Sequence, residues 1–400
     1  MAQMTEDERN SVNKKIIKYI QNNRPKINFS EISIIIEKFP GGLNNDNYKI
    51  IAKEKESQKI LDQYFLKNFK NRIDNKKLES YVQKILGEKD LGPKVLELND
   101  KEKYRIDEYL PDISHIELEE SLKENIIDNI IEIILGFNNL YHLCYYHIDN
   151  NYKINYVENK SLINHNKEII SIDFNINSFC QHIDEYLPKG ILVLNKFIES
   201  YNSNKNIINL DSKIKDLKYY VDNYKSYIVE NIYKNEGYFI FSHSDFHRGN
   251  IVHKKNNLNK LYVLDNEFIN LNLIGYDLMY YLIKSLFGIK GIVENYLDLS
   301  KFYKIYLKYI NKLLKEYDGF KIDSDNLTNV KKYIENIACS KEYFLRLIKL
   351  VLLFDIIYCC DLINFENEFL NEKPIFGFFN YLSLNIEILK QIEEYDISKI

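Results

Sequence analysis

The first hundred residues alternate between β-branched apolar runs and turn-forming residues. The segments EISIIIEKF (31–39) and YKIIAKE (48–54) are rich in Ile, and PGGLNNDN (40–47) joins them. Gly, Asn and Asp favour tight turns, whereas β-branched residues favour strands. This order predicts a strand, a glycine-containing turn and a second strand.

A change in periodicity follows this hairpin. In KKLESYVQKILGEKD (76–90) the apolar residues recur every three or four positions, which predicts a helix that ends before LGP (91–93). KVLEL (94–98) and KYRIDEYL (103–110) then have the pattern of a second hairpin. We expect the boundary between two lobes near residues 107–112.

From about Ile116 onward the pattern is mostly that of long helices, interrupted by short strands that flank a polar motif at 241–252. The Asn-rich segments DNNYKINYVENK (149–160) and NSNKN (202–206) are expected to be surface loops. LIKLVLLFDIIYCCDLI (347–363) is the most apolar stretch, but it carries Lys349, Asp355 and Asp361. A membrane span needs about 20 mostly apolar residues. We therefore predict a buried helix there.

Composition narrows the classes of partner and compartment. The 400 residues are 45% apolar, which is enough for one large domain or two lobes, and the net charge of −4 gives no bulk attraction to nucleic acid. The five Cys form no CxxC pair, which favours a reducing compartment. The N-terminus lacks the apolar core of a signal peptide. We expect a cytoplasmic protein that acts on small molecules.

The segment FSHSDFHRGNIV (241–252) carries the clearest chemistry, because His243, Asp245 and Asn250 have HxDxxxxN spacing. After a further apolar run, LYVLD (261–265), comes Asp265. Phosphoryl transfer requires a carboxylate near the acceptor hydroxyl and oxygen ligands for Mg²⁺. Asp245 suits the first role, and Asn250 and Asp265 suit the second. The alternative is that these residues only cap turns and form loop hydrogen bonds, since the motif by itself can arise by chance in an Asn-rich chain.

The order of strand, polar loop, strand and acid resembles the catalytic and metal-binding loops of the choline/ethanolamine kinase family. That family belongs with the aminoglycoside phosphotransferases and is distantly similar to protein kinases. The resemblance implies that Asp245 is the catalytic base, with His243 in the same catalytic loop, and that Asn250 and Asp265 hold Mg²⁺.

Two further segments continue this resemblance. In DNEF (265–268), Glu267 matches the family's pattern whereas Asn266 departs from it. IGYDLMYYL (274–282) resembles a segment whose Asp braces the catalytic loop, which implies that role for Asp277. The polar residues that follow this Asp in the family are missing here.

The N-terminal segments resemble the nucleotide-binding part of the same family. FPGGLNNDNYKI (39–50) is similar to the loop that covers the nucleotide, although a GG turn alone is more often a simple hairpin. YFLKNFKNRIDNKKLES (64–80) is similar to the strand and helix that supply a phosphate-pairing Lys and its Glu, and Lys53 is the rival cation. YRIDEYLP (104–111) is similar to the adenine hinge. The implied nucleotide-binding residues are Gly41, Gly42, Asn45, Lys67, Glu79, Asp107, Tyr109 and Leu110.

The acceptor pocket is implied by IFGFFNYL (375–382), which resembles the family's aromatic FGYxxY stretch. Aromatic faces hold quaternary ammonium groups through cation–π attraction, and a carboxylate can assist. The candidate acceptor residues are Glu267, Phe354, Tyr358, Phe378 and Tyr381. Packing in the core is an equally good explanation of the aromatic residues. The chain has no Trp, the strongest cation–π partner, so choline and ethanolamine both stay open.

These observations predict a two-lobed, protein-kinase-like α+β fold. Residues 1–110 would form a small β-rich nucleotide-binding lobe, and residues 111–400 a large, mainly helical catalytic and acceptor-binding lobe. The expected reaction is phosphorylation of a small amino alcohol, choline first, by ATP with Mg²⁺. The rivals are ethanolamine kinase, an aminoglycoside-type phosphotransferase and a pseudokinase-like nucleotide-binding protein. The resembling family often forms dimers, so a homodimer is possible, but no segment here requires one.

Overall fold

The structure, a computed structural model, divides the chain into two compact units. The first unit is Met1–His115 with Asn250–Ile269, and the second is Ile116–Gly249 with Asn270–Ile400. The structure describes residues 4–25, 28–39, 45–69, 76–138, 145–148, 154–157, 192, 216, 219, 238–255, 257–286, 297–318, 325–366 and 384–400.

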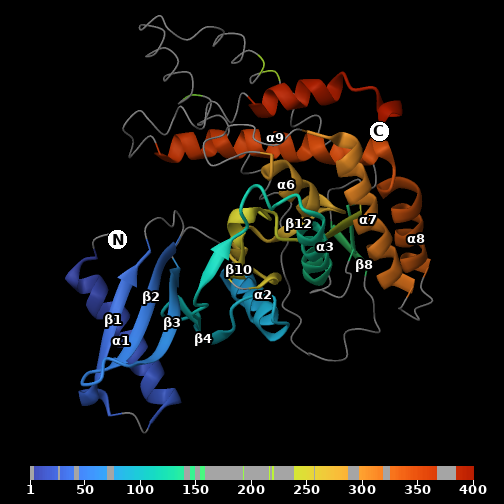
Figure 1. The fold of residues 1–400 in the computed structure, drawn as a ribbon. Coiled ribbons are helices and arrows are strands. Elements are labelled where there is room, and N and C mark those ends of the chain that lie inside the picture. The colour runs from blue at the N-terminus through green and yellow to red at the C-terminus, as the bar shows by residue number, and fades with distance from the viewer. Residues whose placement is uncertain are drawn as a thin grey trace, which may run out of the picture. The chain divides into compact units, whose positions relative to one another are not determined.

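The first unit contains an antiparallel sheet in the order β1-β2-β3-β5-β4. Its first two strands are those expected on either side of the glycine-containing turn, and the last two form the second expected hairpin (Figure 1). The helix predicted at 76–90 is α2, Lys76–Glu88. The strands are β1 Ile32–Lys38, β2 Asn45–Glu54, β3 Ile60–Phe69, β4 Val95–Asn99 and β5 Tyr104–Glu108.

A helix that the sequence analysis did not predict, α1 (Glu6–Asn23), packs on this sheet. It begins with a capping box, because the Thr5 side chain accepts from the Glu8 N–H while the Glu8 carboxylate accepts from the Thr5 N–H. Such caps stabilise a helix by about 1 kcal/mol. The apolar residues that α1 buries in the core of the sheet are Val12, Ile16, Tyr19 and Ile20.

A second, three-stranded sheet explains why residues 250–269 belong to the first unit. The strands β6 (Ile113–His115), β10 (Ile251–Lys254) and β11 (Asn257–Val263) are antiparallel in the order β11-β10-β6. In β10, Val252 pairs with His115, and the Val263 N–H donates to the Leu91 carbonyl at 2.8 Å. This whole hairpin was predicted to lie in the second lobe, because a pairing between segments so far apart in the chain leaves no local signal.

The second unit is mainly helical and also contains a four-stranded antiparallel sheet in the order β12-β9-β7-β8. Its strands are β7 Tyr145–Ile148, β8 Ile154–Val157, β9 Tyr238–Ser242 and β12 Asn270–Leu273. Its helices are α3 Glu124–Asn138, α6 Tyr276–Lys284, α7 Leu299–Asp318, α8 Asp325–Tyr333, a π-helical turn Ile334–Ala338 and α9 Lys341–Glu366; residues 384–393 are also helical.

One expectation for this unit was wrong. Residues 149–160 were expected to form a surface loop, but Ile154–Val157 are strand β8 and pair with β7. The two β-branched residues and the Tyr of INYV favour a strand once a partner is available, and this preference outweighs the Asn-rich composition of the segment.

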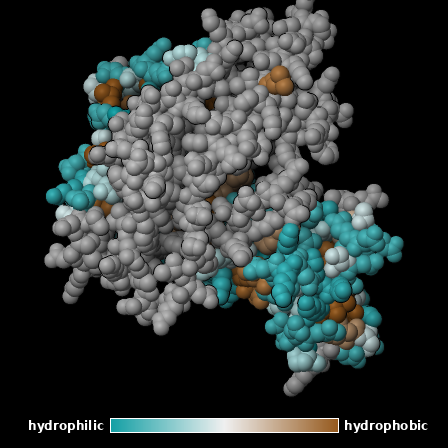
Figure 2. Space-filling view, turned by 180° about the vertical axis from the view of Figure 1, so that it is seen from behind, coloured by the Kyte–Doolittle hydropathy of each residue, from teal (hydrophilic) through white to brown (hydrophobic). Residues whose placement is uncertain are grey.

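The apolar stretch expected to be a buried helix lies in α9, and its side chains from Leu347 to Leu353 are mostly buried. Among the described residues, none of the helices has the length and apolarity needed to cross a bilayer. Figure 2 shows the described surface of the first unit as largely hydrophilic, with small separate hydrophobic groups. Its exposed large apolar side chains include Ile35, Phe39, Ile60, Leu96 and Leu98.

Candidate active site

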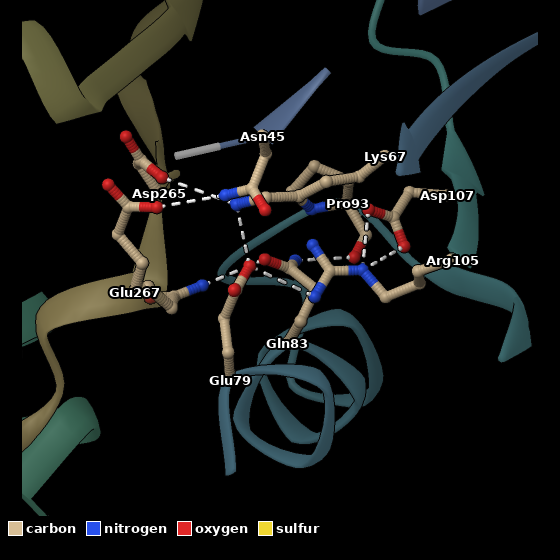
Figure 3. Close-up of polar contacts among 10 residues, drawn as sticks. Asn45, Lys67, Glu79, Gln83, Pro93, Arg105, Asp107, Asp265 and Glu267 are labelled. Atoms are coloured by element: carbon tan, nitrogen blue, oxygen red, sulfur yellow. Dashed lines mark hydrogen bonds and ion pairs between the residues drawn. The ribbon is translucent and has the colours of Figure 1, made fainter. Parts of the chain in front are cut away.

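The first unit buries a lysine that is paired with a glutamate. Lys67 lies on β3 and Glu79 in the first turn of α2, and the Lys67 Nζ donates to the Glu79 Oε1 at 2.8 Å (Figure 3). Both side chains are 5% exposed or less. Lys53, the rival cation, lies six residues farther along β2 than Asn47, the residue that pairs with Lys67. At about 3.4 Å per residue, Lys53 is about 20 Å along the strand from the position opposite Lys67.

Arg105 extends this pair into a chain of alternating charges. Its Nη1 lies 3.3 Å from the Glu79 Oε1, and its Nε donates to both carboxylate oxygens of Asp107 at 2.9 Å. Lys67 and Arg105 are directly opposite in the β3–β5 register, so their side chains share one face of the sheet. Arg105 was not predicted as a site residue, although its spacing of two from Asp107 on a strand indicates a shared face.

The charges of this buried chain set the protonation of its members. Burial alone would lower the pKa of Lys67, but the carboxylates of Glu79 and Asp265 raise it above its ordinary value. Burial would raise the pKa of Glu79, whereas Lys67 and Arg105 lower it. Lys67 is therefore a cation and Glu79 an anion at neutral pH.

Asp265 joins the same cluster from the far end of β11. Its Oδ1 lies 3.4 Å from the Lys67 Nζ, and 46% of its side chain is exposed (Figure 3). Its backbone is left-handed at φ 58°, an uncommon conformation for a residue with a side chain. The Leu264 N–H donates to the Asn250 carbonyl at 2.8 Å, which places Asn250 and Asp265 at the same end of the β10–β11 hairpin. One exposed carboxylate and one amide are suitable oxygen ligands for Mg²⁺.

The residues after Asp265 hold neighbouring parts of the first unit. The Asn45 Nδ2 donates to the Glu267 Oε2 at 2.9 Å (Figure 3). The Asn266 Nδ2 donates to the Gln83 Oε1 at 2.8 Å. Asn266, which departs from the resembling family, thus fastens the end of the hairpin to α2. Asn45 is the first residue of β2, directly after the expected nucleotide-covering turn. Gly41 and Gly42 lie outside the described residues.

The expected adenine hinge, residues 107–110, begins in the last two residues of β5 and extends beyond its end at Glu108. The Asp107 side chain is 2% exposed and bound to Arg105, so it faces the interior; burial raises its pKa even though Arg105 opposes this effect. The Lys49 Nζ lies over the Tyr109 ring, 5.0 Å from its centroid. Leu110 is buried against Val252 and Tyr262. The hinge residues are therefore held by the first unit itself.

In the second unit, Asp277 holds the loop that contains HxDxxxxN. Its carboxylate accepts from the Ser242 hydroxyl at 2.6 Å and from the backbone N–H groups of His243 and Ser244 at 2.8 and 3.0 Å. Burial raises the pKa of Asp277, although His243 and these hydrogen bonds act in the opposite direction. Ser244 has a left-handed backbone, with φ 67°, so the loop turns sharply directly before Asp245.

Asp245 is held on both of its carboxylate oxygens. Its Oδ1 accepts from the Tyr280 hydroxyl at 3.0 Å, and its Oδ2 lies 3.5 Å from the His247 Nε2. The Gly249 N–H donates to the His247 Nδ1 at 3.0 Å, so the neutral ring carries its proton on Nε2, facing Asp245. Burial would raise the pKa of Asp245, but His247, His243 and Lys284 lower it. Asp245 is therefore an anion at neutral pH. Neither His247 nor Tyr280 was predicted as a site residue from the sequence.

The described aromatic residue among the acceptor candidates is Phe354. Its ring lies edge-on to Tyr276 and Tyr280, with centroids 6.2 and 6.4 Å away. The next residue, Asp355, is fully buried and forms an ion pair with Lys284 at 2.8 Å. The side chain of Tyr358, and all of Phe378 and Tyr381, lie outside the described residues.

The comparisons with known proteins agree with this geometry at the level of the fold. No protein-family model and no curated protein sequence matches the chain. A choline kinase from Cryptosporidium parvum has a similar structure, with a TM-score of 0.57, 13% identity and coverage of 96% of this chain and 95% of that one. An ethanolamine kinase from Plasmodium vivax has a TM-score of 0.54, 16% identity and coverage of 94% and 89%.

A putative aminoglycoside phosphotransferase from Ralstonia eutropha is also similar, with a TM-score of 0.52, 11% identity and coverage of 96% of this chain and 99% of that one. At such identities these likenesses define the fold. The chain has a kinase-like α+β fold, as predicted from the sequence. Within that fold, the known structures it resembles include choline and ethanolamine kinases.

Proposed function

We propose that this chain transfers the γ-phosphoryl group of ATP to the hydroxyl of a small amino alcohol, with choline as first choice and ethanolamine as second. The observation that carries the proposal is the buried Lys67–Glu79 pair at 2.8 Å with the exposed acid Asp265 at 3.4 Å from the same ammonium. A kinase-like fold needs such a cation beside the phosphates and such an acid beside the metal.

Each side chain then has a role. Lys67 pairs with the phosphates, Glu79 holds Lys67, and the segment predicted to cover the nucleotide is the one that contains Gly41, Gly42 and Asn45. Asn250 and Asp265 would hold Mg²⁺, which supplies neutralisation of the phosphate charge when it is bound. Asp245 accepts the proton of the acceptor hydroxyl, and its low pKa keeps it ionised for this role.

The charge around Asp355 supports choline over ethanolamine. A primary ammonium favours a pocket with a free carboxylate, because its N–H groups lose hydrogen bonds to water on entry. The carboxylate of Asp355 is already matched by Lys284 at 2.8 Å, and Glu267 accepts from Asn45 in the first unit. Neither acid therefore gives a reason to prefer ethanolamine. The proposed contacts of the acceptor remain the aromatic residues Phe354, Tyr358, Phe378 and Tyr381.

A coupled assay of ADP release tests the proposal with choline, ethanolamine and an aminoglycoside, each with Mg²⁺ present and then chelated. We expect Mg²⁺-dependent turnover that is highest with choline. Turnover with ethanolamine alone would correct the acceptor, and turnover with the aminoglycoside alone would correct its class. Nucleotide binding without turnover of any acceptor would favour the pseudokinase-like alternative.

A further inference from the structure

The base proposed above, Asp245, accepts a hydrogen bond from a tyrosine of α6. The Tyr280 hydroxyl donates to the Oδ1 of Asp245 at 3.0 Å, and the Tyr280 side chain is 1% exposed. The side chain of Asp245 is 16% exposed, and its other oxygen, Oδ2, lies 3.5 Å from His247. The hydrogen bond to Oδ1 restricts rotation of the carboxylate, so it helps to define the position of Oδ2.

Tyr280 is itself fixed by its surroundings in the second unit. Its ring stacks on Tyr276 at 5.9 Å and meets Phe354 edge-on at 6.4 Å. The Lys284 ammonium, one turn farther along α6, lies 5.1 Å from the centroid of the ring and is paired with the buried Asp355. A cation over the ring withdraws electron density from the phenol, which strengthens its hydroxyl as a donor. Buried packing and this cation thus give the hydroxyl one direction and increased polarity.

We propose that Tyr280 is a positioning residue for phosphoryl transfer: its hydroxyl fixes the Oδ1 of Asp245 so that the other oxygen is presented to the acceptor hydroxyl. The inference rests on the proposed function, in which Asp245 is the base. The groups that face Asp245 also include His247 and His243, and Lys284 acts on it electrostatically. Tyr280 lies three positions after Asp277, in the segment where the polar residues of the resembling family are missing.

The chain offers a matched control in the next residue. The Tyr281 side chain is fully buried on the same helix, and its hydroxyl donates to the Ser121 carbonyl at 3.0 Å, away from Asp245. We expect Tyr280→Phe to lower kcat for the preferred acceptor by about ten- to a hundredfold, as is typical of losing a hydrogen bond to a charged group. The KM for ATP should change by less than about twofold, since the nucleotide residues are untouched. Tyr281→Phe should leave kcat within about twofold of the wild type.

A double-mutant cycle with Asp245→Asn separates positioning from general damage. If Tyr280 acts through Asp245, adding Tyr280→Phe to Asp245→Asn should cause little further loss of the residual rate. The inference is overturned if Tyr280→Phe keeps the wild-type kcat, if Tyr281→Phe lowers kcat equally, or if the two losses are additive. A wild-type chain that phosphorylates no acceptor would instead overturn the proposed function, and this inference with it.

A second variant keeps the inference testable if Tyr280→Phe has a melting temperature far below that of the wild type. Lys284→Met with Asp355→Leu removes the cation over the ring together with its counter-charge and leaves the Tyr280 hydroxyl in place. We expect a severalfold fall in kcat at an unchanged KM for ATP, because the phenol becomes a weaker donor and Asp245 loses a nearby positive charge. An unchanged kcat in this folded variant would overturn the proposed role of Lys284 and Tyr280.

Discussion

Replacing Arg105 by Met should destabilise the first unit more than any exposed substitution in it. The Arg105 side chain is 4% exposed and donates to both oxygens of Asp107 at 2.9 Å. Its removal leaves the buried Asp107 without this partner, whereas Glu79 retains Lys67 at 2.8 Å. Breaking a buried ion pair on one side costs about 3–5 kcal/mol of the free energy of unfolding. Natural domains have only about 5–15 kcal/mol in total.

The double variant Arg105→Met, Asp107→Leu isolates the cause of this loss. It removes both charges and fills the site with apolar side chains, so most of the stability should return, to within about 2 kcal/mol of the wild type. The pH dependence should differ as well. Burial already raises the pKa of Asp107 with Arg105 present, and without Arg105 this pKa rises further. A carboxyl with a higher pKa in the folded than in the unfolded chain takes up a proton on folding, so the deficit of the single variant should shrink as the pH falls from 7 toward 5. The double variant lacks this carboxyl and should show no such recovery.

Urea unfolding followed by far-UV circular dichroism at pH 7 and pH 5.5 measures these differences; the chain has no Trp for fluorescence. Because two units can unfold separately, hydrogen exchange of the β5 peptide assigns the loss to the first unit. A single variant within 1 kcal/mol of the wild type, or a double variant no more stable than the single one, would refute the reasoning.

Three further outcomes test the site. Lys67→Ala should lower kcat/KM for ATP by at least about tenfold, whereas Lys53→Ala should change it by less than about twofold. Steady-state kinetics with varied ATP measures both values. A larger loss for Lys53→Ala than for Lys67→Ala would show that the wrong lysine was assigned to the phosphates. Asp265→Ala should abolish Mg²⁺-dependent turnover, and near-wild-type rates in a Mg²⁺ titration would contradict its role as a metal ligand. Gly249→Ala should lower kcat severalfold, because a Cβ there would lie 2.8 Å from the His247 ring; a crystal structure with that ring unmoved would contradict the explanation.

The sequence predicted the elements whose signals are local. The strands around the glycine-containing turn and the helix that carries Glu79 follow from Ile-rich runs and from an apolar period of three to four. The helix α1 could have been predicted too, since Thr5 and Glu8 have capping-box spacing and Val12, Ile16 and Tyr19 lie on one face. That signal was missed because the segment was considered only as a targeting sequence.

Contacts between distant segments could not be predicted in the same way. Arg105 and Asp107 are two positions apart, so the sequence predicts that their side chains lie on the same face of a strand. The contact of Arg105 with Glu79 of α2 is visible only in the structure. Likewise, nothing in the sequence distinguishes Tyr280 from the other tyrosines of the chain, which has thirty-three in total. Its hydrogen bond to Asp245 joins residues that are 35 positions apart. Side-chain reach of this kind depends on tertiary packing, which composition and periodicity do not encode.

The split composition of the first unit has a consequence for how the chain folds as it is made. Residues 1–115 leave the ribosome about 135 residues before the β10–β11 hairpin that completes their unit begins to emerge. Until then, α2 lacks the bond from Asn266 to Gln83, Leu110 lacks Val252 and Tyr262, and Lys67 lacks Asp265. Residues 1–115 therefore stay only partly folded while the first part of the second unit is synthesised. A chain truncated before residue 250 should leave the apolar side chain of Leu110 exposed and should be prone to aggregate.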